Sequence, residues 1–396
     1  MIYKMINDEV NKIESKLIET RRYLHKNPEL SFKEFNTMKF ICNRLDEIGV
    51  NYKSNIAGTG VMAVINGNKV SDNPKCVLIR ADIDALPITE NTSAEYISGT
   101  KGVMHACGHD GHTAILLLLC EVLCALRDKF SGCVKLVFQP GEETSGGAEP
   151  MIKEGVLTNP DVDVCLALHM DPDIDCGKIR VKKGSLYASP DDYKITVIGK
   201  GGHGAEPHNC INPIYISAKI ITLLQNLVKD EVSPQEKAVV SVCMVNSGTA
   251  SNIVPDRAEI IGTARSLKND VRAFLKKRIG EVASAVCNEF GAECIYEYTE
   301  LFPPLINDDG VAEELYQYAV HLLGADNCIL GGEPTMAGED FAYFSQNIPS
   351  VLFKLGCRNE EKGIINPLHH PSFDIDEACL KYGVAVFVSY ILNHNN

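Results

Sequence analysis

An alternation of short apolar runs with helical segments in the first half of the chain constrains the fold most. Residues 6–24 and about 33–48 show apolar positions at helical spacing, and a further helical segment covers 113–126. Strands that alternate with helices predict an α/β domain built on a mostly parallel or mixed sheet. The predicted strands are GVMAVI at 60–65, VLIRADID at 77–84, VKLVFQP at 134–140 and VCLALHM at 164–170.

From about residue 188 the elements follow the order βαββαβ, which is typical of a two-layer ferredoxin-like α+β unit. After Pro303 the pattern returns to helices and a strand at 351–356. Because 396 residues exceed what one ordinary core organises, we expect two domains. The predicted boundaries are a discontinuous α/β domain of 1–187 and 301–396 and an inserted domain of 188–300.

Composition excludes several classes of partner. A formal charge of −14 disfavours nucleic acid and anionic membranes. The apolar stretch at 115–126 is too short to span a bilayer and is interrupted by Glu121, and the charged, amphipathic start of the chain predicts no signal peptide. Fifteen cysteines, an odd number without disulfide-like spacing, indicate a reducing compartment. We therefore expect a cytoplasmic protein.

Polar residues follow three of the predicted strands. Asp82 and Asp84, Glu142 and Glu143, and His169 each stand at the carboxyl end of an apolar run. In open α/β sheets, ligands bind outside the carboxyl ends of the strands. These side chains are therefore predicted to converge on one site.

The segment MHACGHDGHT at 104–113 offers a thiol and three imidazoles. Cys107 and His109 are two residues apart, and in an extended backbone both would point to one face. Thiolate and imidazole together suit zinc or another borderline divalent ion, although a buried cysteine beside a capping histidine fits equally well. His105 and His112 are expected to be supporting or core groups, and Asp110 is a candidate to orient a ligand imidazole.

Two further segments add candidate ligands. Glu142 and Glu143 at a strand end can divide the work, so that one binds metal while the other acts as general base, although a solvated acidic turn is the alternative. LHHPSF at 368–373 supplies two histidines. A cluster of this size is better used by two metals that share a ligand than by one.

A set of motifs resembles the amidohydrolase branch of the aminoacylase and carboxypeptidase superfamily, which includes hippurate hydrolase. The resemblance extends from RRYLHKNPELSFKE at 21–34 to the end of the chain, and its motifs are specific as a set. They are ADIDALP at 81–87, MHACGHDGHT, FQPGEET at 138–144, ALHM at 167–170, GKGGHGAEPH at 199–208, SNIVPD at 251–256, GTARS at 262–266, AGEDFAYF at 337–344 and LHHPSFDIDEA at 368–378.

The resemblance implies two divalent ions, zinc, manganese, cobalt or nickel, in the α/β domain, and an inserted domain that dimerises and covers the site. It implies Glu142 as the general base. His370 departs from the family pattern, in which a small or amide residue is more common after the ligand; His369 is preferred because it keeps the family's distance to Pro371. The implied ligands are Cys107, His109, Glu143, His169 and His369.

In the inserted domain the resemblance assigns three substrate contacts. His203 would stabilise the oxyanion, reaching the partner subunit's site, while Asn252 and Arg265 would bind a substrate carboxylate. The expected reaction is hydrolysis of the amide bond of an N-acyl amino acid by a water activated by the metals and Glu142. A dipeptidase or carboxypeptidase of the same superfamily, a metal-free cysteine hydrolase using Cys107, and a non-catalytic binding protein remain as alternatives.

Overall fold

A computed structural model of the protein describes residues 2–144 and 146–395, which form two compact units. The first unit comprises the chain up to Gly184, Ile306–Gly332 and the residues from Tyr343 onward. The second comprises Ser185–Leu305 and Glu333–Ala342. Among the residues described, no helix has the length and apolar character needed to cross a membrane.

The short segment Glu333–Ala342 groups with the second unit, whereas the predicted boundaries place it in the α/β domain. The segment runs along the second unit because its backbone pairs there. Ala188 donates its N–H to the carbonyl of Ala337 at 3.0 Å, and Thr335 bridges to Tyr187.

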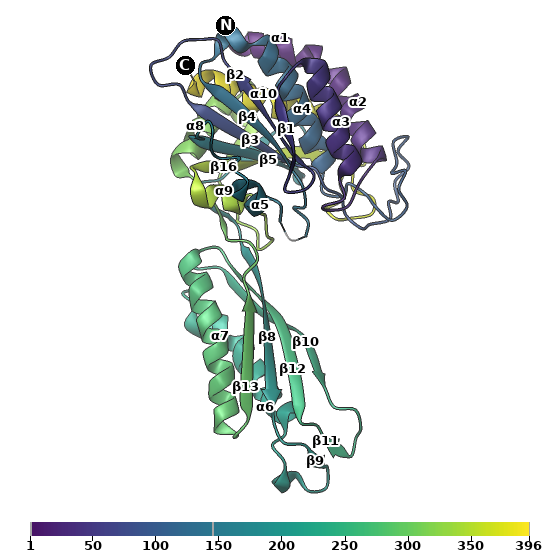
Figure 1. The fold of residues 1–396 in the computed structure, drawn as a ribbon, viewed down its shortest axis with the longest axis vertical. Helices are drawn as coiled ribbons and strands as arrows, with labels where there is room; N and C mark the ends of the chain where they lie inside the picture. Colours follow the sequence, from purple (N-terminus) through teal and green to yellow (C-terminus); the bar gives the residue numbers. More distant parts are fainter. Residues whose placement is uncertain (1, 145, 396) are drawn as a thin grey trace. The chain divides into compact units, whose positions relative to one another are not determined.

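The first unit is built on a mixed sheet. Among the residues described, eight strands lie in the order β1-β2-β4-β3-β5-β16-β6-β15, with parallel pairing at β4-β3-β5-β16 (Figure 1). The central strands are buried on both faces, as a sheet covered by helices requires. The strands are β1 (Tyr52–Ile56), β2 (Gly60–Asn66), β3 (Cys76–Asp82), β4 (Cys133–Gln139), β5 (Val164–Asp175), β6 (Ile179–Val181), β15 (Cys328–Leu330) and β16 (Ser350–Arg358).

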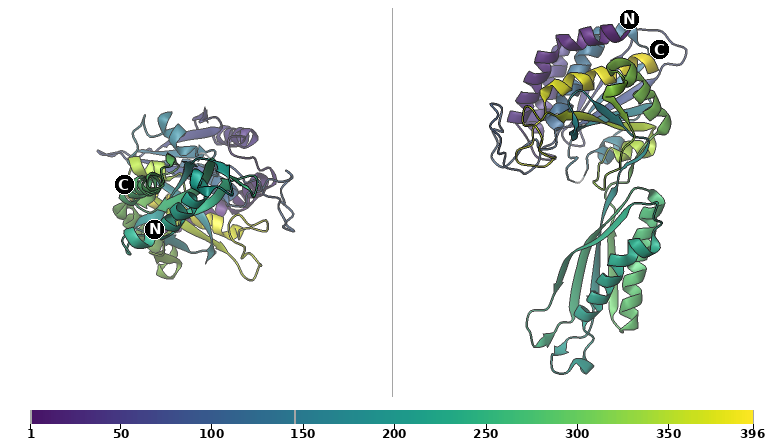
Figure 2. Two further views of the ribbon diagram at one scale, coloured as in Figure 1. Left: turned by 90° about the horizontal axis from the view of Figure 1, so that it is seen from below. Right: turned by 180° about the vertical axis from the view of Figure 1, so that it is seen from behind.

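Helices cover this sheet in two layers. Neighbouring helices α3, α4, α10 and α8 pack on the strands, and α1 and α2 pack outside α4 and α10; the rear view in Figure 2 shows these outer helices in purple beside α10 in yellow. The helix predicted over 6–24 is divided at Ile13 into α1 and α2. The bounds are α1 (Ile2–Lys12), α2 (Glu14–Lys26), α3 (Phe35–Ile48), α4 (His109–Ala125), α5 (Ala148–Lys153), α8 (Asp309–Leu323), α9 (Ala342–Asn347) and α10 (Leu380–His394).

The second unit is a ferredoxin-like α+β sandwich, as predicted. Its antiparallel sheet has the order β10-β12-β8-β13, and α6 and α7 pack together against it. Strands β9 and β11 form a separate two-stranded sheet, and β7 (Gly184–Tyr187) and β14 (Leu305–Asn307), where the chain passes from one unit to the other, form another. The remaining bounds are β8 (Ser189–Ile198), β9 (Gly202–His203), α6 (Pro213–Glu231), β10 (Ala238–Ser247), β11 (Ile253–Val254), β12 (Arg257–Ser266), α7 (Asn269–Glu289) and β13 (Glu293–Thr299).

Candidate metal centre

Three adjacent parallel strands bring the predicted polar residues to one edge of the large sheet. Strand β3 lies between β4 and β5 and ends at Asp82, and Glu142 and Glu143 follow the end of β4 after a turn at Gly141. His169 lies within β5 rather than at its end, but β5 pairs with β3 only as far as Ala167. His169 therefore stands just beyond this pairing, level with the other polar residues.

The five predicted ligands come together in two groups of three. Cys107, His109 and His169 form one group, and Cys107, Glu143 and His369 form the other; within each group the potential ligand atoms lie within 4.8 Å of one another. The Cys107 Sγ lies 3.5 Å from His169 Nε2, and His369 Nε2 lies 3.5 Å from Glu143 Oε1. Because Cys107 belongs to both groups, the arrangement fits two ions that share one ligand.

Within the part of the chain that the structure describes, two of these potential ligand atoms are buried without a hydrogen bond, as expected for atoms that bind a metal ion. His109 Nε2 and Glu143 Oε1 are buried, and neither has a hydrogen-bond partner among the described residues. A buried polar atom without a partner is costly, so each such atom calls for an explanation. Thiolate, imidazole and carboxylate together suit a divalent transition metal, so the side chains at this site fit such an ion.

A tight turn places His109 in this cluster. Helix α4 begins at His109 itself, four residues earlier than predicted, and Gly108 before it adopts a φ of +89°. A Cβ at Gly108 would lie 2.8 Å from Met170 Cγ. The extended backbone assumed for Cys107–His109 is therefore wrong, because the chain turns into the helix between the two ligands and a glycine makes that turn possible.

Hydrogen bonds fix the ring orientation of both buried histidines. His109 donates from Nδ1 to the Asp84 carbonyl at 3.0 Å, and His169 donates from Nδ1 to the Met170 carbonyl at 2.7 Å. A carbonyl can only accept, so both rings carry a proton on Nδ1 and turn Nε2 toward the cluster.

The choice between His369 and His370 follows the loop geometry. His369 has a φ of +62° and donates its backbone N–H to the carbonyl of Ala106 at 2.8 Å, next to Cys107. His370 takes part in neither group, and its Nδ1 accepts a hydrogen bond from the Ser372 N–H at 3.0 Å. The structure thus places His369 beside the other candidate ligands.

Asp84 connects two of the candidate ligands, a role that the sequence did not reveal. Its Oδ1 lies 3.2 Å from His109 Nδ1, and its Oδ2 accepts the Glu143 N–H at 3.0 Å and the Ser31 hydroxyl at 2.7 Å. Asp110 was expected to orient a ligand imidazole but instead contacts Arg21 and His25. The sequence feature that points to this role of Asp84 is its position two residues after the end of the central strand β3.

The other two histidines of the motif are buried and belong to neither group of candidate ligands. His112 donates from Nδ1 to Asp82 Oδ1 at 2.5 Å and accepts the Met170 N–H on Nε2 at 2.9 Å, so both ring nitrogens are occupied. His105 is buried, and burial lowers its pKa to about 4. His105 is therefore neutral at pH 7.

Electrostatics differ among the candidate ligands. Burial raises the pKa of the Cys107 thiol well above its ordinary value, and Glu143 adds to that effect. Burial lowers the pKa of His169 well below its usual range, with Lys354 contributing. Burial would also lower the pKa of His109, but the carboxylates of Asp82 and Asp84 raise that pKa well above its ordinary value. The cluster therefore holds protons tightly on Cys107 and His109, and a cation bound there would displace them.

The three candidate substrate contacts lie in the second unit but at different ends of it. His203 on β9 pairs with Ile253 on β11, and the Asn252 carbonyl accepts the Gly204 N–H at 2.8 Å, so His203 and Asn252 are neighbours. Arg265 pairs with Pro190 near the far end of β12 and donates from Nη1 to the Met336 carbonyl at 2.9 Å.

Arg265 lies eight residues after Arg257 on β12, so the two positions are roughly 26 Å apart at a rise of about 3.3 Å per residue. Figure 1 shows β9 and β11 at one end of this unit, and β11 comes just before the start of β12, whereas Arg265 stands near the other end of that strand. One chain's second unit therefore does not bring Asn252 and Arg265 together on one carboxylate.

We expect Asp84→Asn to weaken metal binding by about 10- to 100-fold. A carboxylate presents one oxygen to His109 and the other to the Glu143 backbone, whereas an amide has a single acceptor oxygen. Calorimetric titration of metal-free protein with zinc measures the change. Ser31→Ala, which removes one hydrogen bond to Asp84 but leaves these two contacts, serves as the control. Unchanged zinc affinity in Asp84→Asn would refute the role of Asp84.

Comparison with known proteins identifies the chain's relatives. Residues 78–393 match the family model described as Peptidase family M20/M25/M40. A thermostable carboxypeptidase from Saccharolobus solfataricus is 39% identical over 100% of this chain and 99% of its own length. A hippurate hydrolase from Campylobacter jejuni is 37% identical over 98% of both chains.

A solved structure supports the same relationship. A dinuclear metal-binding peptidase of the M20 family from Bacillus subtilis superposes with a TM-score of 0.85 at 33% identity, covering 97% of this chain and 99% of that one. The fold, the paired groups of metal-competent residues and these matches agree. The chain belongs to peptidase family M20/M25/M40 and is a metal-dependent amidohydrolase of that family.

Proposed function

We propose that this enzyme hydrolyses the amide bond of N-acyl amino acids at a centre held by Cys107, His109, Glu143, His169 and His369. The observation that carries the proposal is the pair of three-donor groups that share Cys107, with Glu142 beside them. Two divalent ions bound there, zinc, manganese, cobalt or nickel, would supply the positive charge that polarises water and the scissile carbonyl. The hippurate hydrolase supports the substrate class, since hippurate is an N-acyl amino acid.

Glu142 is proposed as the proton carrier. Glu142 is buried, with 8% of its surface exposed. A carboxylate oxygen of Glu142 and the potential ligand atoms of His109 and Glu143 lie within 4.8 Å of one another. Glu142 takes a proton from the attacking water as the new C–O bond forms at the carbonyl carbon. It then gives that proton to the leaving amine nitrogen as the C–N bond breaks, so the carboxylate is regenerated.

The second unit is proposed to contribute His203 to the oxyanion and Asn252 and Arg265 to the substrate carboxylate. Because His203 and Asn252 lie far from Arg265 within one chain, the proposal assigns the two sets to different subunits of a homodimer. Strand β10 supports this assembly, since it forms an edge of the sheet and exposes Met244 and Val245.

Arg265→Met is expected to raise KM for an N-acetyl amino acid by about 10- to 100-fold, the loss that removing one charged hydrogen-bond pair produces. Steady-state kinetics with the acid and with its C-terminal amide would measure the change; the amide lacks the carboxylate and should respond little. Arg257→Met, on the same strand but exposed and paired with Glu259, is the matched control. Equal losses for the acid and the amide would contradict carboxylate recognition by Arg265.

A carboxypeptidase or dipeptidase activity is the second candidate, and the carboxypeptidase from Saccharolobus solfataricus favours it. Both reactions use the same centre and differ in the group on the acyl side of the amide. A panel of N-acetyl and N-benzoyl amino acids against dipeptides and blocked dipeptides separates them. Faster hydrolysis of the N-acyl amino acids is the expected result, and preference for peptides would replace the proposal by the alternative.

A metal-free cysteine hydrolase requires a reactive thiolate at Cys107. Burial instead raises the pKa of this thiol, whereas catalytic cysteines have a lowered pKa. A non-catalytic binding protein would not need Glu142 beside a complete ligand set.

We also place the enzyme in the reducing cytoplasm, a proposal supported by the fifteen free cysteines.

A further inference from the structure

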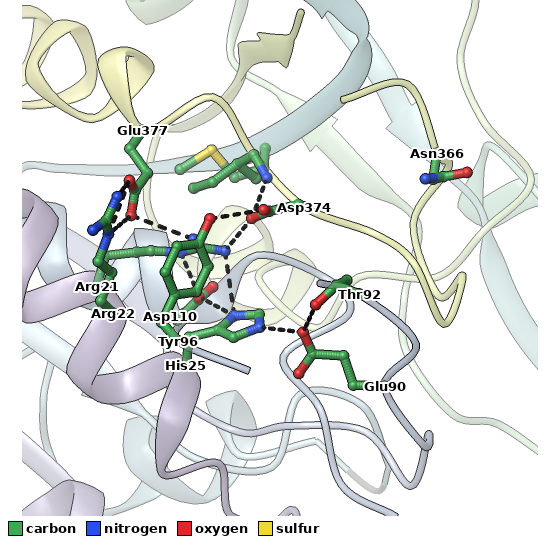
Figure 3. A network of polar contacts seen from close by, with 12 residues as sticks. Arg21, Arg22, His25, Glu90, Thr92, Tyr96, Asp110, Asn366, Asp374 and Glu377 are labelled. Atoms are coloured by element: carbon green, nitrogen blue, oxygen red, sulfur yellow. Dashed lines mark hydrogen bonds and ion pairs between the residues drawn. The ribbon is translucent and has the colours of Figure 1, made fainter. Parts of the chain in front are cut away.

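Helix α2 carries a buried arginine that contacts carboxylates from two distant parts of the chain. The side chain of Arg21 has no exposed surface. Figure 3 shows its guanidinium among the carboxylates of Asp110, Asp374 and Glu377. It donates from Nε to Asp110 Oδ2 at 2.8 Å and from Nη2 to Asp374 Oδ1 at 2.7 Å, and Nη1 lies 3.4 Å from Glu377 Oε1. A buried arginine is tolerated only where such partners compensate for its lost hydration.

The partners of Arg21 belong to the segments that carry metal ligands. Asp110 follows His109 directly in the first turn of α4, and Asp374 lies five residues after His369 in the loop before α10. One guanidinium therefore ties the start of α4 to the loop of His369. Arg21 itself lies in neither three-donor group.

A second set of hydrogen bonds joins the same two segments through His25. His25 Nδ1 lies 2.7 Å from Asp110 Oδ2, and His25 Nε2 lies 3.3 Å from Glu90 Oε1. Next to Glu90, Asn91 donates its N–H to the Pro371 carbonyl at 2.7 Å. The Tyr96 hydroxyl donates to Asp374 Oδ2 at 2.7 Å. Figure 3 shows one connected network of Arg21, His25, Glu90, Tyr96, Asp110 and Asp374.

His369 depends on this network more than the other histidines do. His109 and His169 are buried, and each donates from its ring to a carbonyl. The His369 side chain is 53% exposed, and His369 itself has a left-handed backbone conformation in a loop without regular structure. Packing does little to hold it, so the bonds that anchor its loop decide where its Nε2 stands.

We infer that Arg21 is a positioning residue that holds the His369 loop in register with His109 and thereby sets the metal affinity of the Cys107–Glu143–His369 group. The inference rests on the metal centre proposed above. It predicts a selective effect: loss of the Arg21 contacts weakens one of the two metal positions and leaves the Cys107–His109–His169 position unchanged. A general loss of stability would weaken both.

Titration of the metal-free full-length protein with Co²⁺, followed by calorimetry and by visible absorption, tests the inference. The wild-type protein is expected to bind two equivalents. Arg21→Lys keeps the charge but loses the planar fork, and Asp374→Asn removes the charge on the loop side. In each variant one equivalent should bind about 10- to 100-fold more weakly, with changed cobalt absorption for that equivalent alone.

Neighbouring residues provide the controls. Arg22→Lys changes the next residue of the same helix, whose side chain is 44% exposed, pairs with Glu377 and lies over the Tyr96 ring at 4.8 Å. This variant should bind both equivalents normally. Tyr96→Phe removes the hydrogen bond from the Tyr96 hydroxyl to Asp374. If Arg21→Lys does not fold, Tyr96→Phe and Asp374→Asn together test the inference. Two unchanged equivalents, or equal weakening of both, would overturn the role of Arg21. A wild-type protein that binds no second equivalent would instead overturn the proposed centre.

Discussion

Replacing Glu142 with glutamine is expected to reduce hydrolysis of an N-acetyl amino acid by at least about 100-fold, and up to about 10,000-fold, while two metal equivalents stay bound. Glutamine keeps the size of the side chain but cannot accept a proton at neutral pH. The ligand atoms of the two three-donor groups that share Cys107 belong to other residues, so metal binding should persist. Initial-rate kinetics and metal analysis of the same preparation measure both quantities.

Glu149→Gln is a suitable control, because Glu149 lies close in the chain, but its side chain is 45% exposed and pairs with Lys153. Its turnover should equal that of the wild type. Turnover within a few-fold of the wild type in Glu142→Gln would exclude Glu142 as the proton carrier. Loss of metal in that variant would assign it to the ligand set instead.

Replacing Cys107 with serine is expected to remove both metals and with them all measurable turnover. Cys107 belongs to both three-donor groups, so its loss leaves two donors in each. A neutral serine hydroxyl is a weak ligand for the borderline ions that bind thiolate and imidazole. Metal analysis after dialysis, together with a hydrolysis assay, measures the outcome.

Cys42→Ser, at a partly exposed cysteine of α3 outside both three-donor groups, should keep two equivalents and normal turnover. A Cys107→Ser protein that retains both metals but not turnover would contradict the shared-ligand account. That result would favour the nucleophilic cysteine considered above. The two variants therefore separate a metal ligand from a nucleophile at the same position.

The α/β sheet and the inserted βαββαβ unit could be predicted because their signals are local. Apolar runs and helical spacing report burial directly, and the chain order of these elements fixes the fold class. The meeting of Asp84, Glu143 and His169 at one edge of the sheet also followed from their places after apolar strands. That prediction needed no knowledge of side-chain contacts.

Features that depend on contacts between distant segments could not be read in this way. The chain turns at Gly108 between two candidate ligands, and only the packing of this glycine against Met170 shows why a side chain is excluded there. Asp84 and Asp110 are both buried carboxylates next to histidines in sequence or space, and only the fold decides which one holds His109. Likewise, the separation of Asn252 from Arg265 follows from the register of β12 and β8.

The central claim is that two metals and the residues around Cys107 hydrolyse N-acyl amino acids. Its most direct test is to strip the protein with a chelator, return zinc or manganese in measured equivalents, and follow hydrolysis of N-acetyl and N-benzoyl amino acids. We predict no turnover in the metal-free protein and a rate that rises until two equivalents per chain are bound. Full turnover in the metal-free protein would contradict the account.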